Sequence, residues 1–183
     1  MNWLHTIFIL AMAYLTVFLE GADGWVRHVL GAQITLLPAL MVYTSLTAGV
    51  GSVGLLAVCG GLWLDSLSEN PLGVSILPLF GIGFVLLWRR ELLLREHQFA
   101  QMALGAAAGL LFPLGTLFLL LNLGLAPALG WRTVWEWVVA ALTGGVLTPA
   151  CFWFFDRLRQ AFEYPALKQS SFRPDREIKR GRL

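Results

Sequence analysis

The sequence is short of charge. Only 13% of its 183 residues are charged, whereas 57% are hydrophobic and the mean hydropathy is +0.71. A soluble domain usually carries about 25% charged residues, so this chain lacks the polar surface of a water-soluble globule. Lipid must then surround most of its surface, and we expect an integral membrane protein.

Cysteine is also scarce, and its positions exclude further classes. Cys59 and Cys151 both lie inside apolar runs, where a thiol behaves as a small hydrophobe. Neither has neighbours with metal-ligand spacing, so we expect no structural disulfide and no metal site. The sequence also has no Ser/His/Asp or Cys/His arrangement, no HExxH and no phosphate-binding loop. These features predict a non-catalytic protein without a cofactor.

Uninterrupted apolar sequence is abundant instead. Strands of a membrane barrel alternate apolar and polar residues, whereas GFVLLW and LFPLGTLFLLLNL do not. The predicted fold class is therefore all-α, a polytopic helical membrane protein. Clusters of charge, glycine and proline separate six apolar segments, which are Trp3 to Leu19, Ile34 to Thr47, Val50 to Leu64, Val74 to Trp88, Ala100 to Leu123 and Val134 to Phe155.

The number of spans depends on the second and third segments. Residues 29–64 contain no charge, and the small-residue run TAGVGSVG (47–54) predicts a tight helical hairpin and six spans. Merging the two segments would give five. The first segment is expected to be retained, because no basic residue precedes it as in a secretory signal.

Basic residues predict the orientation, since Lys and Arg near span ends stay in the cytoplasm. With six spans, eleven basic residues lie on one side, and only Arg27 and Arg132 lie on the other. Both termini are therefore expected to be cytoplasmic. Residues 1–164 would form the transmembrane domain, with the last helix continuing to Phe162 before Pro165.

Residues 165–183 are predicted to form a flexible basic tail. The tail would adhere to the anionic leaflet or dock a cytoplasmic partner. Its small basic surplus does not indicate nucleic-acid binding.

Two segments are candidates for contacts. In GGLWLDSLSENPLGVSIL (60–77), Asp65 ends a span, Asn70 and its neighbours offer cap groups, and Pro71 is expected to restart a helix. This segment is either a well-capped reversal or a rim that holds Asp65 as a partner or ligand contact. Gly105 and Gly109, in GAAAG, predict close helix packing within the chain or with a second subunit.

GGLWLDSLSENPLG and VLTPACFWFFDRLRQAF (146–162) together resemble signature segments of MreD, the family of bacterial rod shape-determining membrane proteins. The resemblance covers most of Ile34 to Phe162. It implies two sets of signature positions, which are Asp65, Pro71, Leu72 and Gly73 on the outer side and Pro149, Arg157 and Arg159 in the last span.

The same resemblance implies a function. MreD proteins are multi-pass proteins of the bacterial inner membrane and non-catalytic parts of the machinery that elongates the cell wall. An MreC-like membrane protein is the implied partner and, through it, MreB, RodA and a class B penicillin-binding protein. The implied fold is similar to the substrate-binding subunits of energy-coupling-factor transporters, so a small-molecule-binding transporter subunit is the alternative.

Overall fold

The protein is described by a computed structural model that covers residues 3–22, 35–68, 70–90, 98–125 and 130–162. Within these ranges the chain forms helices and no strands, which confirms the predicted all-α class. The six helices are α1 (Trp3–Ala22), α3 (Leu37–Thr47), α4 (Val50–Leu67), α5 (Ile76–Arg89), α6 (Gln98–Asn122) and α7 (Trp131–Phe162). The predicted tail, residues 165–183, lies outside the described residues.

Helices α3 and α4 form the predicted hairpin. Between them, Ala48 and Gly49 have extended backbone conformations. The Gly49 carbonyl accepts hydrogen bonds from the N–H groups of Ser52 and Val53, at 3.1 and 3.2 Å, and these bonds begin α4. Residues 37–67 are therefore two helices and not one long one.

Three helices, α4, α6 and α7, are long and apolar enough to cross a membrane. The remaining helices are apolar but shorter, with 11 residues in α3, 14 in α5 and an apolar stretch from His5 to Gly21 in α1. At about 1.5 Å per residue, α3 is about 16 Å long, which is roughly half of the ~30 Å hydrocarbon core.

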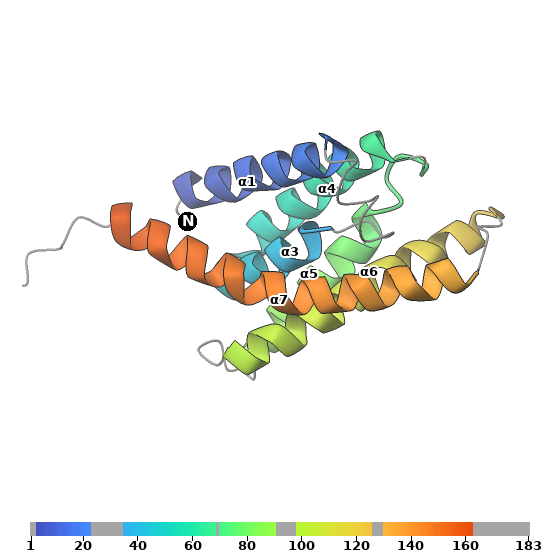
Figure 1. Ribbon diagram of the computed structural model, residues 1–183. Helices are drawn as coiled ribbons and strands as arrows, with labels where there is room; N and C mark the ends of the chain where they lie inside the picture. Colours follow the sequence, from blue (N-terminus) through green and yellow to red (C-terminus); the bar gives the residue numbers. More distant parts are fainter. Residues whose placement is uncertain (1–2, 23–34, 69, 91–97, 126–129, 163–183) are drawn as a thin grey trace, which may run out of the picture.

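Helix α3 lies at the centre of the molecule, surrounded by the other five helices (Figure 1). Every residue from Leu37 to Leu46 is buried. The hydroxyls of Thr44, Ser45 and Thr47 donate to carbonyls one turn earlier at 2.6–2.7 Å. These local bonds satisfy the three hydroxyls, so this part of the helix can be covered by its neighbours without water.

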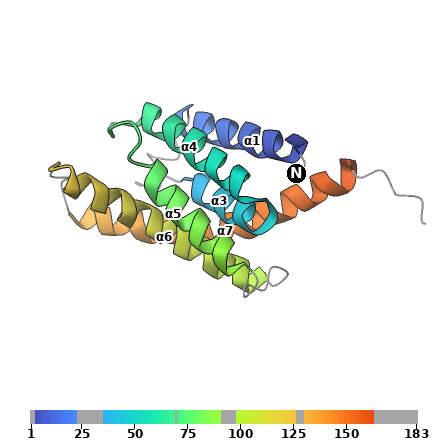
Figure 2. The ribbon, with the colours of Figure 1, turned by 180° about the vertical axis from the view of Figure 1, so that it is seen from behind.

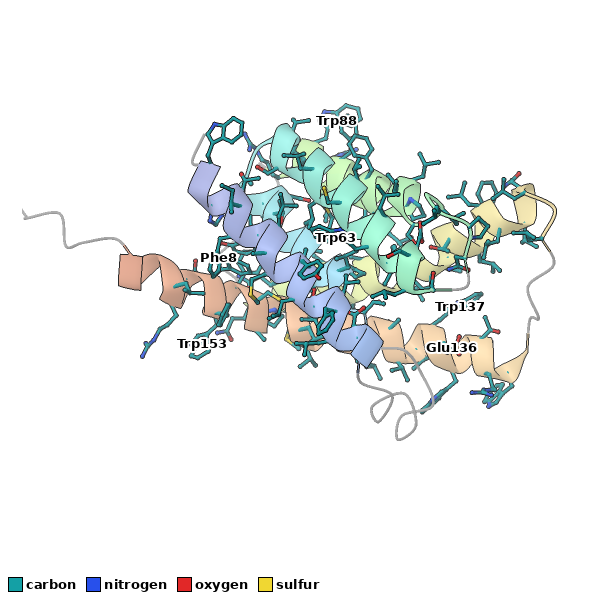
Figure 3. The ribbon with its side chains drawn as sticks, turned by 90° about the horizontal axis from the view of Figure 1, so that it is seen from above. Phe8, Trp63, Trp88, Glu136, Trp137 and Trp153 are labelled. Atoms are coloured by element: carbon teal, nitrogen blue, oxygen red, sulfur yellow. The ribbon has the colours of Figure 1, made fainter. Side chains whose placement is uncertain are left out.

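Helix α1 runs parallel to α4 on one side of this centre. Near the helix starts, the hydroxyl oxygens of Thr6 and Ser52 are 2.9 Å apart, and further along the rings of Tyr14 and Trp63 meet edge to face at 5.3 Å. Trp63 lies between the two helices in Figure 3. The ends of α1 and α4 therefore share one end of the bundle.

Helices α6 and α7 form an antiparallel pair that extends past the ends of the other helices in both side views (Figures 1 and 2). The second half of α7 leaves α6 and packs on α1 and α3. There Phe155 stacks on Tyr43 at 4.3 Å and meets Phe8 edge to face at 5.9 Å. Pro149 lies inside α7 between these two contact regions. The first turn of α7 is at the far tip of the pair, and its last turns are beside the start of α1.

Candidate functional site

Asp65 lies in the last turn of α4 and holds the start of α5. Its Oδ2 accepts hydrogen bonds from the backbone N–H groups of Gly73, at 2.8 Å, and Ser75, at 3.1 Å. The side chain of Ser75 makes no cap bond of its own, so the carboxylate satisfies N–H groups that a helix start leaves unpaired. Gly73 has φ +95°, a conformation that favours glycine.

Because of these hydrogen bonds, α5 begins later in the chain than the sequence predicts. The segment SENPLG predicts that a helix restarts at Pro71, but α5 begins at Ile76, so that expectation was wrong. Residues 72–75 form a turn instead, because the Asp65 carboxylate fixes the N–H groups of Gly73 and Ser75. Leu72 is exposed and Asn70 is half-buried, with its N–H 3.4 Å from Ser68 Oγ.

Asp65 is only 2% exposed. Its Oδ1 is buried as well and has no hydrogen-bond partner. In this structure the carboxylate therefore contacts the chain's own backbone, as the capped-reversal interpretation expects.

Glu20 caps the start of α3, as Asp65 caps the start of α5. Its Oε1 accepts a hydrogen bond from the N–H of Leu36, the residue before the first turn of α3, at 2.7 Å. Its Oε2 is buried without a hydrogen-bond partner. Sequence reasoning placed Glu20 at the end of a span but did not identify this role. An acid at the end of an apolar helix was the available signal, but its partner is 16 residues away.

The two short helices thus start in the same way. Both have a proline in the first turn, Pro38 in α3 and Pro78 in α5, where the missing N–H breaks no helix hydrogen bond. In both helices, a carboxylate from a neighbouring helix accepts a backbone hydrogen bond at the N-terminal end. In the described residues, no group of three His, Cys, Asp or Glu side chains could hold a metal ion.

Gly105 and Gly109 face α7. A Cβ on Gly105 would overlap the Gly144 carbonyl oxygen and the Thr148 side chain, and one on Gly109 would overlap the Ala140 carbonyl oxygen. Close backbone packing of this kind holds helices together in lipid. The structure therefore uses these two glycines within the chain.

The predicted positions of the last span lie apart from the Asp65 site. Pro149 is half-buried in the middle of α7, and Arg157 is exposed two turns later. Arg159 is in the same helix, and its side chain is outside the described part. Asp65 and the predicted positions in the turn after it therefore lie apart from the predicted positions in α7, and the two sets are not brought together into one site.

An apolar groove of about 310 Å³ lies between α5 and α6. It is lined on α5 by Pro78, Gly81 and Val85 and on α6 by Leu104, Ala107 and Leu111, among others. A Cβ on Gly81 would meet nothing within 4 Å, whereas Gly115 lies against Pro78 at one end. The contact between Gly115 and Pro78 therefore lies at one end of the row of lining residues. It contains hydrocarbon groups and no charged side chain.

No family model matches the chain, and no curated protein or solved structure is significantly similar to it.

Proposed function

We propose that this protein is a non-catalytic scaffold of the bacterial inner membrane that acts in the complex elongating the cell wall. One observation carries the proposal. The paired ends of α6 and α7 extend past the helices around α3 and expose large apolar side chains. Because these side chains project past the rest of the bundle, they are available to a partner as well as to lipid.

The surface where α6 ends and α7 begins is called here the hairpin tip. It exposes large aromatic side chains. Trp131 is 82% exposed, and Phe118, Leu123 and Trp135 are also exposed. At about 1.5 Å per residue, α7 is about 48 Å long and exceeds the ~30 Å hydrocarbon core. If the basic C-terminal end of α7 lies at one membrane surface, the tip reaches the opposite surface or beyond it.

The resemblance to MreD supplies the partner, an MreC-like protein, and through it MreB, RodA and a class B penicillin-binding protein. A cytoplasmic position for both termini, which the basic residues predict, would place the hairpin tip on the outer side. An MreC-like protein has its folded domain on that side.

The carboxylates of Asp65 and Glu20 help to compare the scaffold with the two alternatives, an enzyme and a transporter subunit. Asp65 and Glu20 are the acids best placed for chemistry inside the bundle, and both accept bonds from helix starts. The alternative of a transporter subunit would be favoured by a polar pocket opening beside Asp65. The α5–α6 groove gives it no support, because it is apolar and lies elsewhere.

Native purification tests the proposal. The full chain, tagged and extracted in mild detergent from cells that contain the MreC homologue, should carry that protein with it. Trp131→Ala should reduce the recovered partner several-fold. Trp153→Ala is the matched control, because Trp153 is 67% exposed on the other half of α7 and should leave recovery unchanged. A stable, partner-free protein from these cells would contradict the proposal.

A further inference from the structure

The α5–α6 groove and the helical turn that follows it in α5 together have the depth of one membrane leaflet. Eleven residues separate Pro78, where the helices touch, from Arg89 at the end of α5, a rise of about 16 Å. This is close to half of the ~30 Å hydrocarbon core. If Arg89 lies at the headgroup level, the closed end of the groove is near the midplane.

The open end of the groove carries aromatic and basic groups. Beyond the lining residue Leu86, Trp88 is 76% exposed, and Arg89 and Arg90 are both exposed. Figure 3 shows Trp88 extending outward from the ribbon. Tryptophan prefers the headgroup level, and arginine binds phosphate through its planar set of N–H donors.

These features together match one ligand class. We infer that the groove binds one acyl chain of an anionic phospholipid whose phosphate lies at Arg89 and Arg90. A tail of one leaflet points from the headgroup to the midplane, as the groove does. Its charged end then meets two cations, and its apolar end meets only hydrocarbon side chains.

A partner's transmembrane helix fits the same groove less well. Such a helix needs about 20 residues to span the core and would need a seam along most of that length. The groove is lined on α5 only from Pro78 to Leu86, about 12 Å at 1.5 Å per residue. At Pro78 it is closed by the contact with Gly115.

Photocrosslinking with defined lipids tests the inference. The full chain is reconstituted with phosphatidylglycerol or phosphatidylcholine that carries a photoreactive group in the acyl chain, and adducts are mapped by peptide mass spectrometry. Adducts on the lining segments, residues 78–86 and 104–111, should form several-fold more with phosphatidylglycerol. The double variant Arg89→Gln/Arg90→Gln should reduce them by about 25-fold, about fivefold for each arginine, since each basic residue near an anionic surface is worth about 1 kcal/mol.

Matched variants separate the groove from the rest of the surface. Gly81→Leu should block adducts of both lipids, and Gly54→Leu should not, because a Cβ at either position meets nothing within 4 Å but Gly54 does not line the groove. Arg132→Gln should also leave the adducts unchanged, because this exposed arginine is at the hairpin tip. Thermal unfolding checks that each variant is folded.

Two results would overturn the inference. One is equal labelling of residues 78–86 and 104–111 by the two lipids in the unaltered chain. The other is photocrosslinking from position 81 in cells that captures a polypeptide in place of lipid. Basic residues elsewhere do not obscure either result, because adducts are counted by position.

Discussion

Helix α3 and the α6–α7 pair differ in how they meet their surroundings. α3 is covered by five helices and has no exposed residue between Leu37 and Leu46. Toward the hairpin tip, α6 and α7 pack along one seam and expose their outer faces. Both regions are apolar, so hydropathy does not distinguish them.

This difference in exposure predicts which substitutions change the stability of the fold and which change only binding to other molecules. In α3 each side chain has protein neighbours on every side, and a substitution there must change the packing. The outer faces of α6 and α7 carry exposed side chains, so a substitution there should leave the packing of the chain unchanged and alter only what that surface contacts. The glycine seam, where Gly105 and Gly109 of α6 contact Gly144 and Ala140 of α7, is intermediate. There the two backbones pack as closely as in a protein core, although the helices are exposed on their other faces.

The seam offers the strongest test of this distinction. Gly105→Leu should abolish the folded state or destabilise it by more than about 3 kcal/mol, because its side chain would overlap the Gly144 carbonyl and Thr148. Gly54→Leu, which meets open space, should have little effect. Thermal unfolding in detergent, followed by tryptophan fluorescence, measures both. Equal stability of the two variants would show that the seam does not hold the pair together.

A pair of aromatic truncations compares the two regions directly. Tyr43→Ala should cost about 3 kcal/mol, because Tyr43 is 0% exposed and packs on Phe152 and Phe155. Phe118→Ala, on the exposed face of α6, should cost less than about 0.5 kcal/mol. The same unfolding measurement applies. If Phe118→Ala were as damaging as Tyr43→Ala, the outer face of α6 would belong to the folded core.

The cap on α5 is expected to matter less than these core contacts. Asp65→Ala should cost about 2 kcal/mol, since it leaves the N–H groups of Gly73 and Ser75 without their acceptor. Asp65→Asn retains a carbonyl oxygen at that place and should cost about 1 kcal/mol or less. Comparable losses in both variants would mean that the negative charge, and not the acceptor, is what α5 requires.

The apolar runs predicted the helices and the turn between α3 and α4, because uninterrupted hydrophobic sequence excludes a barrel and small residues permit a tight reversal. They could not predict the α5–α6 groove. A helix surrounded by lipid and protein is apolar on all faces, so its sequence does not indicate which face meets which neighbour. Gly105 and Gly109 predicted close packing, but their partner, Gly144, is known only from the structure.

The candidate site was predictable to a similar extent. Polar residues between two apolar runs identified Asp65 and its turn. The start of α5 was misplaced because a side chain ten residues away from Ser75 decides it. Local sequence rules describe caps from the same helix end, whereas Asp65 and Glu20 cap helices other than their own.

Glu20 gives the smallest expected effect and the finest test of the comparison. Glu20→Ala removes one acceptor, from the N–H of Leu36, and should cost about 1 kcal/mol, as loss of a helix cap does. Asp156→Ala, an exposed acid on α7, is the control and should be silent in the same unfolding measurement. Because α3 is held on all sides by packing, its cap should contribute less than the cap of α5, which has one exposed side. If Glu20→Ala lowered the free energy of unfolding more than Asp65→Ala does, this order would be reversed. The Glu20 carboxylate would then contribute more to the position of α3 than the surrounding helices do.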